Sequence, residues 1–294
     1  MSATILLAVD GSEAAGKAIE LLAGYGGDRA AIAVSVLNVQ EPPPAVSPEL
    51  ALDFGPVEAA LRASGQALVT RAETALHAAG LQTDASVRLG FPAATILREA
   101  GEKSADLIAM GTRGHGMLQG FAFGSVAMRV AHASRVPVWL VHPQCTLPKA
   151  LGKSLRVLLA VDGTAPSLSA ARRLVAWRRW LGQLDVQIAF VQRPLGLLAT
   201  VLPPHDDVRN EWSTRAAEEA TQAARQALAK TGVAQHLHIT YGDPVEEIAR
   251  LTAHTGAELI ALGTRGLGAA HHALIGSVAL KTAANAAVPV MLVR

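Results

Sequence analysis

The feature that most constrains the fold of this 294-residue chain is a set of landmarks that occurs twice at one constant spacing. The landmarks that recur 152 residues apart include Asp10 and Asp162, Val39 and Val191, Gly90 and Gly242, Gly111 and Gly263, Gly124 and Gly276, Ser125 and Ser277, and Pro137 and Pro289. Each copy is far longer than a solenoid repeat and is long enough to bury a core of its own. We infer that one whole domain has been duplicated.

The boundary between the copies lies in a turn-rich stretch. Pro143, Pro148, Gly152 and two lysines make the segment between the copies polar and unfavourable for regular structure. We therefore expect one domain over residues 1–143 and a second over residues 154–294.

Within each copy, apolar runs of strand length alternate with segments of helical spacing. In the first copy the runs are 4–9, 31–39, 83–89, 106–110 and 136–141, and the helical segments are 13–25, 56–79, 92–103 and 125–133. The second copy repeats this order. Strands separated by helices form parallel sheets that are covered on both faces. The pattern predicts an α/β fold: two tandem doubly wound domains, each a five-stranded parallel sheet with helices on both faces.

Two turns of each copy follow apolar runs and carry polar or glycine residues. Ligands of such sheets bind at the carboxyl ends of strands, near the point where the strand order reverses. The turns after the first and fourth strands are therefore expected to be neighbours. This would place Asp10-Gly11-Ser12 beside the loop from Gly111 to Ser125, and Asp162-Gly163-Thr164 beside the loop from Gly263 to Ser277.

The loop after the fourth apolar run has the composition of a phosphate site. A buried strand, a glycine-rich turn and a helix N-terminus together present backbone N–H groups to an anion. We expect Gly111 and Gly114 to adopt backbone angles closed to other residues and to admit a phosphate closely. Ser125 is expected to cap the next helix, and its N–H and those of Val126 and Ala127 to point at the anion. The alternative is a glycine-rich connection that ends in a capping serine.

The spacing of this loop separates it from two familiar nucleotide motifs. It has no lysine followed by Ser or Thr, as a P-loop requires, and no G-x-G-x-x-G order after the first strand. The order G-x2-G-x9-G-[ST], present twice, instead resembles the ATP-binding branch of the universal stress protein family. The segments that carry this resemblance are 8–12, 105–114, 124–126 and 136–138, with 160–164, 257–266, 276–278 and 288–290. Ala127 and Ala279 depart from it, since that family often has a hydroxyl residue there.

The resemblance implies a tandem member with adenine nucleotide alpha hydrolase-like domains that bind ATP, with any Mg²⁺ carried on the phosphates. It implies that Asp10 and Val39 contact the adenine end, Val39 through its backbone. It assigns ribose and phosphates to Gly111, Gly114, Gly124, Ser125 and Val126. The corresponding residues of the second domain are Asp162, Val191, Gly263, Gly266, Gly276, Ser277 and Val278. Arg113 and Arg265, inside the two loops, either pair with phosphate or lie in solvent.

Three functions remain open at this point. The first is an ATP-binding stress-response or signalling protein, and it is favoured because no general base is evident near the phosphates. The second is a slow ATPase or autophosphorylating enzyme, and the third is an interaction scaffold that binds no nucleotide. The resemblance further implies an intrachain pseudo-dimer of the two domains, with 136–141 and 288–293 as candidate pairing strands, and a possible homodimer.

Charge and composition exclude other classes. A net charge of +2 leaves no footprint for nucleic acid or an anionic membrane, and no run approaches the ~18 apolar residues of a membrane helix. The single Cys145 and the absence of a basic leader favour a cytoplasmic protein. Two further patterns are interpreted as surface features: the basic segment with Trp177 and Trp180, and the histidine pairs His236/His238 and His271/His272.

Overall fold

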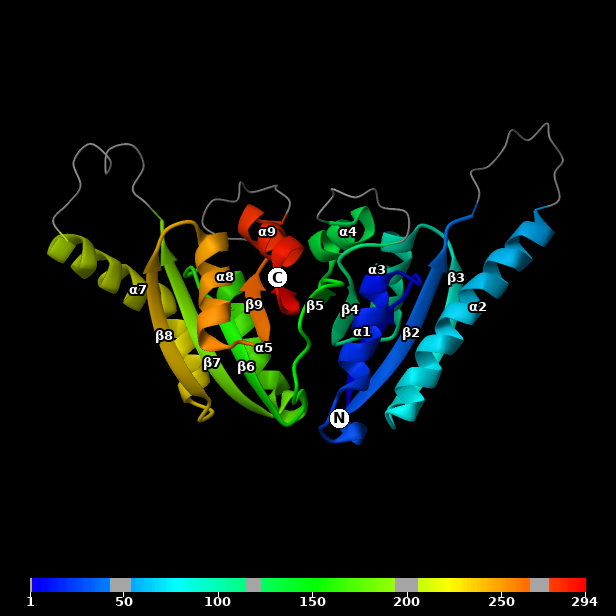
Figure 1. Ribbon diagram of the computed structural model, residues 1–294, viewed down its shortest axis with the longest axis horizontal. Helices are drawn as coiled ribbons and strands as arrows, with labels where there is room; N and C mark the ends of the chain where they lie inside the picture. Colours follow the sequence, from blue (N-terminus) through cyan, green and yellow to red (C-terminus); the bar gives the residue numbers. More distant parts are fainter. Residues whose placement is uncertain (1, 43–53, 115–122, 194–205, 265–274) are drawn as a thin grey trace, which may run out of the picture. The chain divides into compact units, whose positions relative to one another are not determined.

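The computed structural model describes residues 2–42, 54–114, 123–193, 206–264 and 275–294, and for 206–213 it describes the backbone alone. The described chain separates into two compact units, Met1–Gln144 and Cys145–Arg294. Both are α/β domains in which strands and helices alternate (Figure 1).

The elements of the first domain follow the order expected from the apolar runs. They are β1 (Ala3–Ala8), α1 (Glu13–Ala23), η1 (Arg29–Ala31), β2 (Ile32–Gln40), α2 (Gly55–Ala78), β3 (Gln82–Leu89), α3 (Pro92–Glu102), β4 (Leu107–Gly111), α4 (Ser125–Ala133) and β5 (Val138–Val141). β5 begins two residues later than expected. Pro137 has no N–H to donate, and Ser134 Oγ binds both the N–H and the carbonyl of Val136 in a turn.

The second domain repeats this sequence of elements. They are β6 (Ser154–Ala160), α5 (Ala165–Leu181), β7 (Gln183–Gln192), α7 (Asp206–Ala229), β8 (Ala234–Tyr241), α8 (Pro244–Thr255), β9 (Leu259–Gly263), α9 (Ser277–Asn285) and β10 (Val290–Val293). The element order and fold class predicted from the duplication are therefore confirmed.

Each domain has a five-stranded parallel sheet whose strand order reverses beside its first strand. The order is β3-β2-β1-β4-β5 in the first domain and β8-β7-β6-β9-β10 in the second. From β1 the chain moves outward to β2 and β3, and then returns to the other side of β1 for β4 and β5. β1 and β4 therefore flank the point of reversal, where doubly wound sheets bind ligands.

The helices pack in pairs that follow from this path. α1 contacts α2, and α3 contacts α4; in the second domain α5 contacts α7, and α8 contacts α9. Because parallel crossovers are right-handed, reversal of the strand order places the two pairs on opposite faces of the sheet. The central strands are accordingly apolar, and Leu107, Ile108 and Ala109 of β4 are wholly buried. No helix among the described residues is both long enough and apolar enough to cross a bilayer.

Candidate functional site

The acidic turn after β1 lies directly against the glycine loop after β4. A Cβ atom added to Gly114 would stand 2.7 Å from Oδ2 of Asp10. Ser12 Oγ lies 3.1 Å from the carbonyl oxygen of Arg113, also in the loop. The two turns expected to be neighbours in the first domain are thus in contact.

Asp10 also organises its own turn. Its Oδ1 accepts hydrogen bonds from the Ser12 N–H at 3.0 Å and from the Ser12 hydroxyl at 2.6 Å. Ser12 is the N-cap of α1, and its Oγ accepts from the Ala15 N–H. In the second domain Asp162 Oδ1 accepts in the same way from the N–H and hydroxyl of Thr164. One carboxylate oxygen of Asp10 therefore builds the turn, while the other faces the glycine loop.

The two ends of the glycine loop are held together by backbone hydrogen bonds. In the first domain the Gly124 N–H donates to the Thr112 carbonyl at 2.8 Å, and the Thr112 N–H donates to Val141 at the end of β5. The second domain has the same hydrogen bond, which the Gly276 N–H donates to the Thr264 carbonyl at 2.7 Å. The start of α4 or α9 is thereby fixed beside the end of the fourth strand of its domain.

The backbone angles expected of Gly111 and Gly114 are not found. Neither Gly111, Gly114 nor Gly263 has a φ angle in the left-handed region, and Gly124 has φ −76°. A Cβ on Gly111 would instead lie 2.6–2.9 Å from Ala14 and the backbone of α1, and one on Gly263 would meet the backbone of α5 equally closely. These two glycines let the fourth strand approach a helix N-terminus, whereas Gly114 admits the carboxylate of Asp10.

Ser125 was expected to cap α4, but it is the first residue of the helix. The cap is Gly124, which has no side chain, and among the described residues no side-chain hydrogen bond caps the helix; Ser125 is exposed. The first helical hydrogen bond runs from the Met128 N–H to Gly124. The N–H groups of Ser125, Val126 and Ala127 consequently lie outside the helix's own ladder, at the positive end of its dipole.

α9 begins in the same way as α4. Gly276 is its cap, Ser277 is its first residue and is exposed, and no side chain caps it. The first helical bond runs from the Leu280 N–H to Gly276. Both domains therefore present an uncapped helix N-terminus behind the glycine loop, with Val126 and Val278 half-buried at the second helical position.

Val39 lies on the part of β2 that extends beyond the end of β1. The register between β1 and β2 ends at the pair Ala8 and Leu37, but β2 stays paired with β3 up to Gln40. The backbone edge of Val39 on the β1 side therefore extends past the end of β1. Val191 has the same position, since the register of β6 with β7 ends at Ala189.

Asn38 was not among the predicted site residues, although its segment is more polar than the matching segment of the second domain. Its side chain is buried, and its Nδ2 donates to the Val9 carbonyl at 2.7 Å, just before Asp10. It therefore ties the end of β1 to β2 beside Val39. Phe190 has this position in the second domain and cannot make such a bond. The surroundings of the strand end therefore differ between the two domains. A polar residue inside an apolar strand was the signal that could have drawn attention to Asn38.

A pair of threonines next to the glycines was also missed. Thr112 and Thr264 are buried, and among the described residues neither Oγ1 has a hydrogen-bond partner. Arg113 is half-buried, and its Nε likewise has no partner there. Arg265 and Gly266 lie outside the described residues. The loop that contacts the Asp10 turn therefore carries two side-chain donors without partners among the described residues.

These features agree with the comparison of the chain with known proteins. A sequence profile of the universal stress protein family matches residues 1–142 and again residues 154–294. The chain belongs to the universal stress protein family. Its tandem organisation follows from the two matches.

Relatives from several organisms share this similarity. A universal stress protein of Mycolicibacterium smegmatis is 28% identical over 235 residues, which cover 73% of this chain and 70% of that protein. One of Bacillus subtilis is 28% identical over 150 residues, or 47% of this chain and 98% of the relative. The crystal structure of a universal stress protein from Archaeoglobus fulgidus superposes with a TM-score of 0.69 at 21% identity, covering 99% of this chain and 96% of that one. This last likeness concerns the fold.

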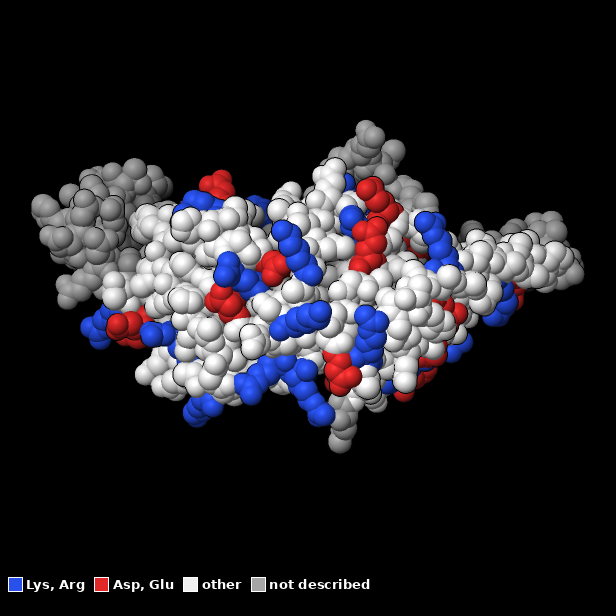
Figure 2. All heavy atoms as spheres, turned by 60° about the horizontal axis from the view of Figure 1, so that its bottom comes forward, with Lys and Arg blue, Asp and Glu red and all other residues white. Residues whose placement is uncertain are grey.

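The basic segment of this universal stress protein is organised around two buried tryptophans. Trp177 and Trp180 are each 4% exposed, and their ring centroids lie 5.2 Å apart. Arg173 stacks over Trp177 at 5.5 Å, and Arg178 donates to the Thr231 carbonyl. Figure 2 shows Lys and Arg side chains at the surface, with Asp and Glu side chains among them. Neither tryptophan is free to stack on a base, in agreement with the interpretation as a helix surface.

The two histidines of β8 lie beside polar residues of β7. His238 Nε2 lies 2.8 Å from Gln187 Oε1, and His236 Nε2 lies 3.7 Å from Asp185. Burial, followed by the charges of nearby His236, His254 and Arg250, lowers the pKa of His238. Among the described residues no group of three or more His, Cys, Asp or Glu is placed to hold a metal ion. His271 and His272 lie outside the described residues.

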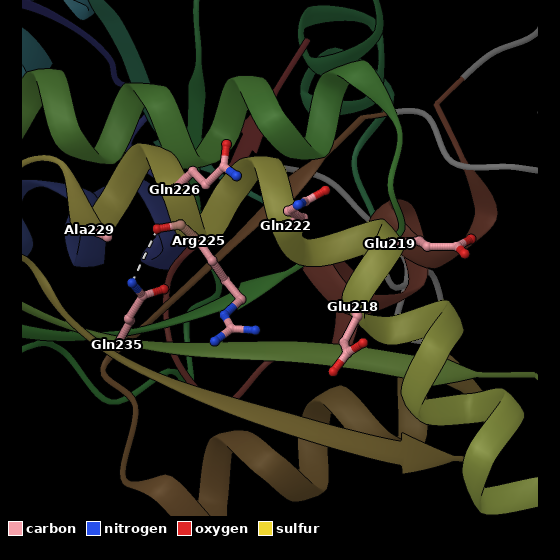
Figure 3. A pocket seen from close by; sticks show the side chains of 7 residues that line it. All are labelled: Glu218, Glu219, Gln222, Arg225, Gln226, Ala229 and Gln235. Atoms are coloured by element: carbon pink, nitrogen blue, oxygen red, sulfur yellow. Dashed lines mark hydrogen bonds between the residues drawn. The ribbon is translucent and has the colours of Figure 1, made fainter.

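A groove of about 520 Å³ runs along α7, away from the predicted site residues. Its lining residues are Glu218, Glu219, Gln222, Arg225, Gln226, Ala229 and Gln235. Figure 3 shows Gln235 on β8 donating to the Arg225 carbonyl (3.1 Å) and Glu219 pointing away from the strand. The lining has mixed charge and comes almost wholly from one helix face, so it lacks the converging polar groups of a ligand site.

Proposed function

We propose that this universal stress protein binds ATP, with one site in each domain, and that nucleotide occupancy serves a stress-response or signalling role. The observation that carries the proposal is the position of the Asp10 carboxylate against Gly114, beside an uncapped helix N-terminus. A carboxylate and three N–H groups that lie outside the hydrogen bonds of their own helix, at one sheet edge, can recognise the two ends of a nucleotide.

The phosphates would lie at the helix start. In the first domain the donors are the N–H groups of Ser125, Val126 and Ala127, the Ser125 hydroxyl and the Arg113 guanidinium. Hydrogen bonds to charged groups contribute about 1.5–3 kcal/mol each, so a few of them are enough for specific phosphate binding. The second domain would use Ser277 and Val278 in the same way. Any Mg²⁺ would arrive bound to the phosphates.

The adenine end would lie between the ends of β1 and β2. Asp10 Oδ2 would accept hydrogen bonds from the nucleoside, and the backbone of Val39 would read the base where the pairing with β1 stops. Asp162 and Val191 would have these roles in the second domain. Phe190 replaces Asn38 in that domain, so its base wall is more apolar, and we expect the two sites to differ in affinity.

We propose a nucleotide-binding protein rather than an efficient enzyme. The Oδ1 atom of Asp10 already accepts two hydrogen bonds from Ser12, which hold the carboxylate in place as a ligand. General bases need a carboxylate or imidazole aimed at a water. Release of phosphate from ATP at several turnovers per minute would contradict this part of the proposal. A cytoplasmic location and the pairing of domains or chains stay predictions.

Equilibrium dialysis with radiolabelled ATP tests the proposal. The double variant S125E/S277E places a carboxylate at the first position of α4 and α9, where it favours the helix dipole but repels phosphate. We expect the variant to fold and to bind ATP at least ten-fold more weakly, because a charge pair at ~4 Å contributes about 1–4 kcal/mol near a surface. M128E adds the same charge to the exposed face of α4 and should bind normally. Equal binding by all three proteins would overturn the proposed site.

A further inference from the structure

One strand end beside each glycine loop carries a basic residue that differs between the domains. In the first domain Gly111 pairs with Val141, and the Thr112 N–H donates to the Val141 carbonyl at 3.0 Å. His142 follows, next to the loop. In the second domain the Thr264 N–H donates to Val293 at 2.7 Å, so the residue in the same place is Arg294. At this chain position the first domain thus has a histidine and the second an arginine.

His142 lies among the charged groups of the first site. Its side chain is buried, and its Nδ1 accepts a hydrogen bond from the Gln144 N–H at 3.2 Å, which leaves Nε2 as the donor of the neutral ring. Burial lowers the pKa of His142, the positive charge of Arg113 in the loop lowers it further, and the carboxylate of Glu13 at the start of α1 raises it. The same Arg113 is a proposed phosphate donor, so an anion there also acts on His142.

The charge of Glu13 has no counterpart in the second domain, where Ala165 begins α5. The charged groups that act on His142 are Arg113 from the loop and Glu13 from α1. A bound phosphate would offset the repulsion between Arg113 and a protonated His142. Binding and protonation of His142 would then favour each other, as linkage requires.

We propose that His142 is a phosphate-side residue of the first nucleotide site and makes that site bind ATP more tightly at acidic pH, whereas Arg294 leaves the second site insensitive to the same titration. The inference rests on the proposed function, because it needs nucleotide in the loops. It gives the two domains different roles: one responds to pH, and the other holds nucleotide across the same range.

The test uses chains with one open site. S277E blocks the second site and leaves the first, and S125E does the reverse. On the S277E chain, ATP affinity is measured from about pH 5.5 to about pH 8 with His142 and with H142Q. The glutamine keeps a donor but cannot gain charge. The ratio of the two affinities therefore cancels the titration of ATP itself, whose γ-phosphate loses its last proton within this pH range.

We expect the His142 chain to bind about ten-fold more tightly than H142Q at pH ~5.5, and the ratio to approach one near pH ~8, since ten-fold corresponds to about one pKa unit on binding. H142R should bind tightly throughout. On the S125E chain, R294H should introduce the pH dependence that Arg294 lacks. Thermal unfolding of each variant checks that it is folded.

The outcomes separate the two claims. Binding of ATP by the S277E chain with one pH profile for His142 and H142Q would overturn the inference and leave the proposed function standing. Failure of the wild-type chain to bind ATP at any pH would overturn both.

Discussion

The Oδ2 atom of Asp10 lies 2.7 Å from the point where a Cβ on Gly114 would stand. This approach joins the end of β1 to the loop after β4, which are neighbours because the strand order reverses between them. A side chain at position 114 would have to displace the carboxylate. Position 114 therefore needs a glycine because Asp10 occupies the space of a side chain, and not because of the backbone angles of Gly114.

Replacing Gly114 by alanine should therefore weaken ATP binding more than it weakens the fold. The new methyl group meets a carboxylate and not backbone, and moving that carboxylate would strain its two hydrogen bonds with Ser12, so we expect the free energy of unfolding to fall by about 1 kcal/mol. Displacement of Asp10 should lower ATP affinity of the first site at least ten-fold, measured by dialysis on the S277E chain. The matched control is G16A, in α1, whose Cβ would meet nothing within 4 Å. It should bind ATP normally and gain about 0.5–1 kcal/mol in stability.

Gly111 should behave in the opposite way. In G111A the methyl group would clash with the backbone of α1 at 2.8–2.9 Å, and backbone cannot move aside as a carboxylate can. We expect a loss of about 1–3 kcal/mol in the free energy of unfolding, measured by urea denaturation. G263A should show the same loss for the second domain. If G111A is as stable as G16A, the packing role of Gly111 is wrong.

A buried carboxylate on α3 depends on one arginine. Glu99 is 3% exposed in its side chain, and its Oε1 lies 2.6 Å from Arg88 Nε on β3. R88M would leave this carboxylate without its charged partner, and we expect a loss of about 1–3 kcal/mol in chemical denaturation. The control R98M removes an exposed pair with Glu102 at 3.6 Å, and its effect should stay below about 1 kcal/mol. Equal losses in the two variants would contradict the account.

His238 should make the second domain less stable in acid. Its pKa in the folded chain lies below the ordinary value of 6.5, chiefly because of burial. The unfolded chain then binds the proton more readily, so the stabilisation is present above pH 6.5 and is lost as the pH falls below it. H238Q can still donate to Gln187 but does not titrate. Between about pH 7.5 and pH 5, the free energy of unfolding should fall less for H238Q than for the wild-type chain. The difference should be on the order of 0.5 kcal/mol, because the side chain is half-exposed. Identical pH profiles would count against this explanation.

The duplication was enough to predict the fold and to bring the right turns together. The offset between Asp10 and Asp162 identified two domains. The alternation of strands and helices predicted the order of the elements, and their bounds in the first domain agree to within two residues. The doubly wound topology then placed Asp10 beside the glycine loop, which the structure confirms for the first domain. These features follow from chain order and hydrophobic pattern, which are local properties of the sequence.

Roles that depend on three-dimensional contact were not predictable in this way. Gly111 was interpreted through its backbone freedom, but its neighbour is the start of α1, a contact that only the packing of β4 against α1 defines. Serine is a residue type that often caps helices. The hydrogen bond between the Gly124 N–H and the Thr112 carbonyl nevertheless places the cap of α4 one residue earlier, at Gly124. The position of His142 beside the loop follows from the register between β4 and β5. No local sequence pattern connects this residue to a loop thirty residues earlier, so the sequence did not reveal it.

The most direct test of the central claim is to count the nucleotides on each chain. Native mass spectrometry of the wild-type protein with saturating ATP should show two molecules per chain, and S125E or S277E should each show one. A wild-type chain that carries no nucleotide under these conditions would contradict the account.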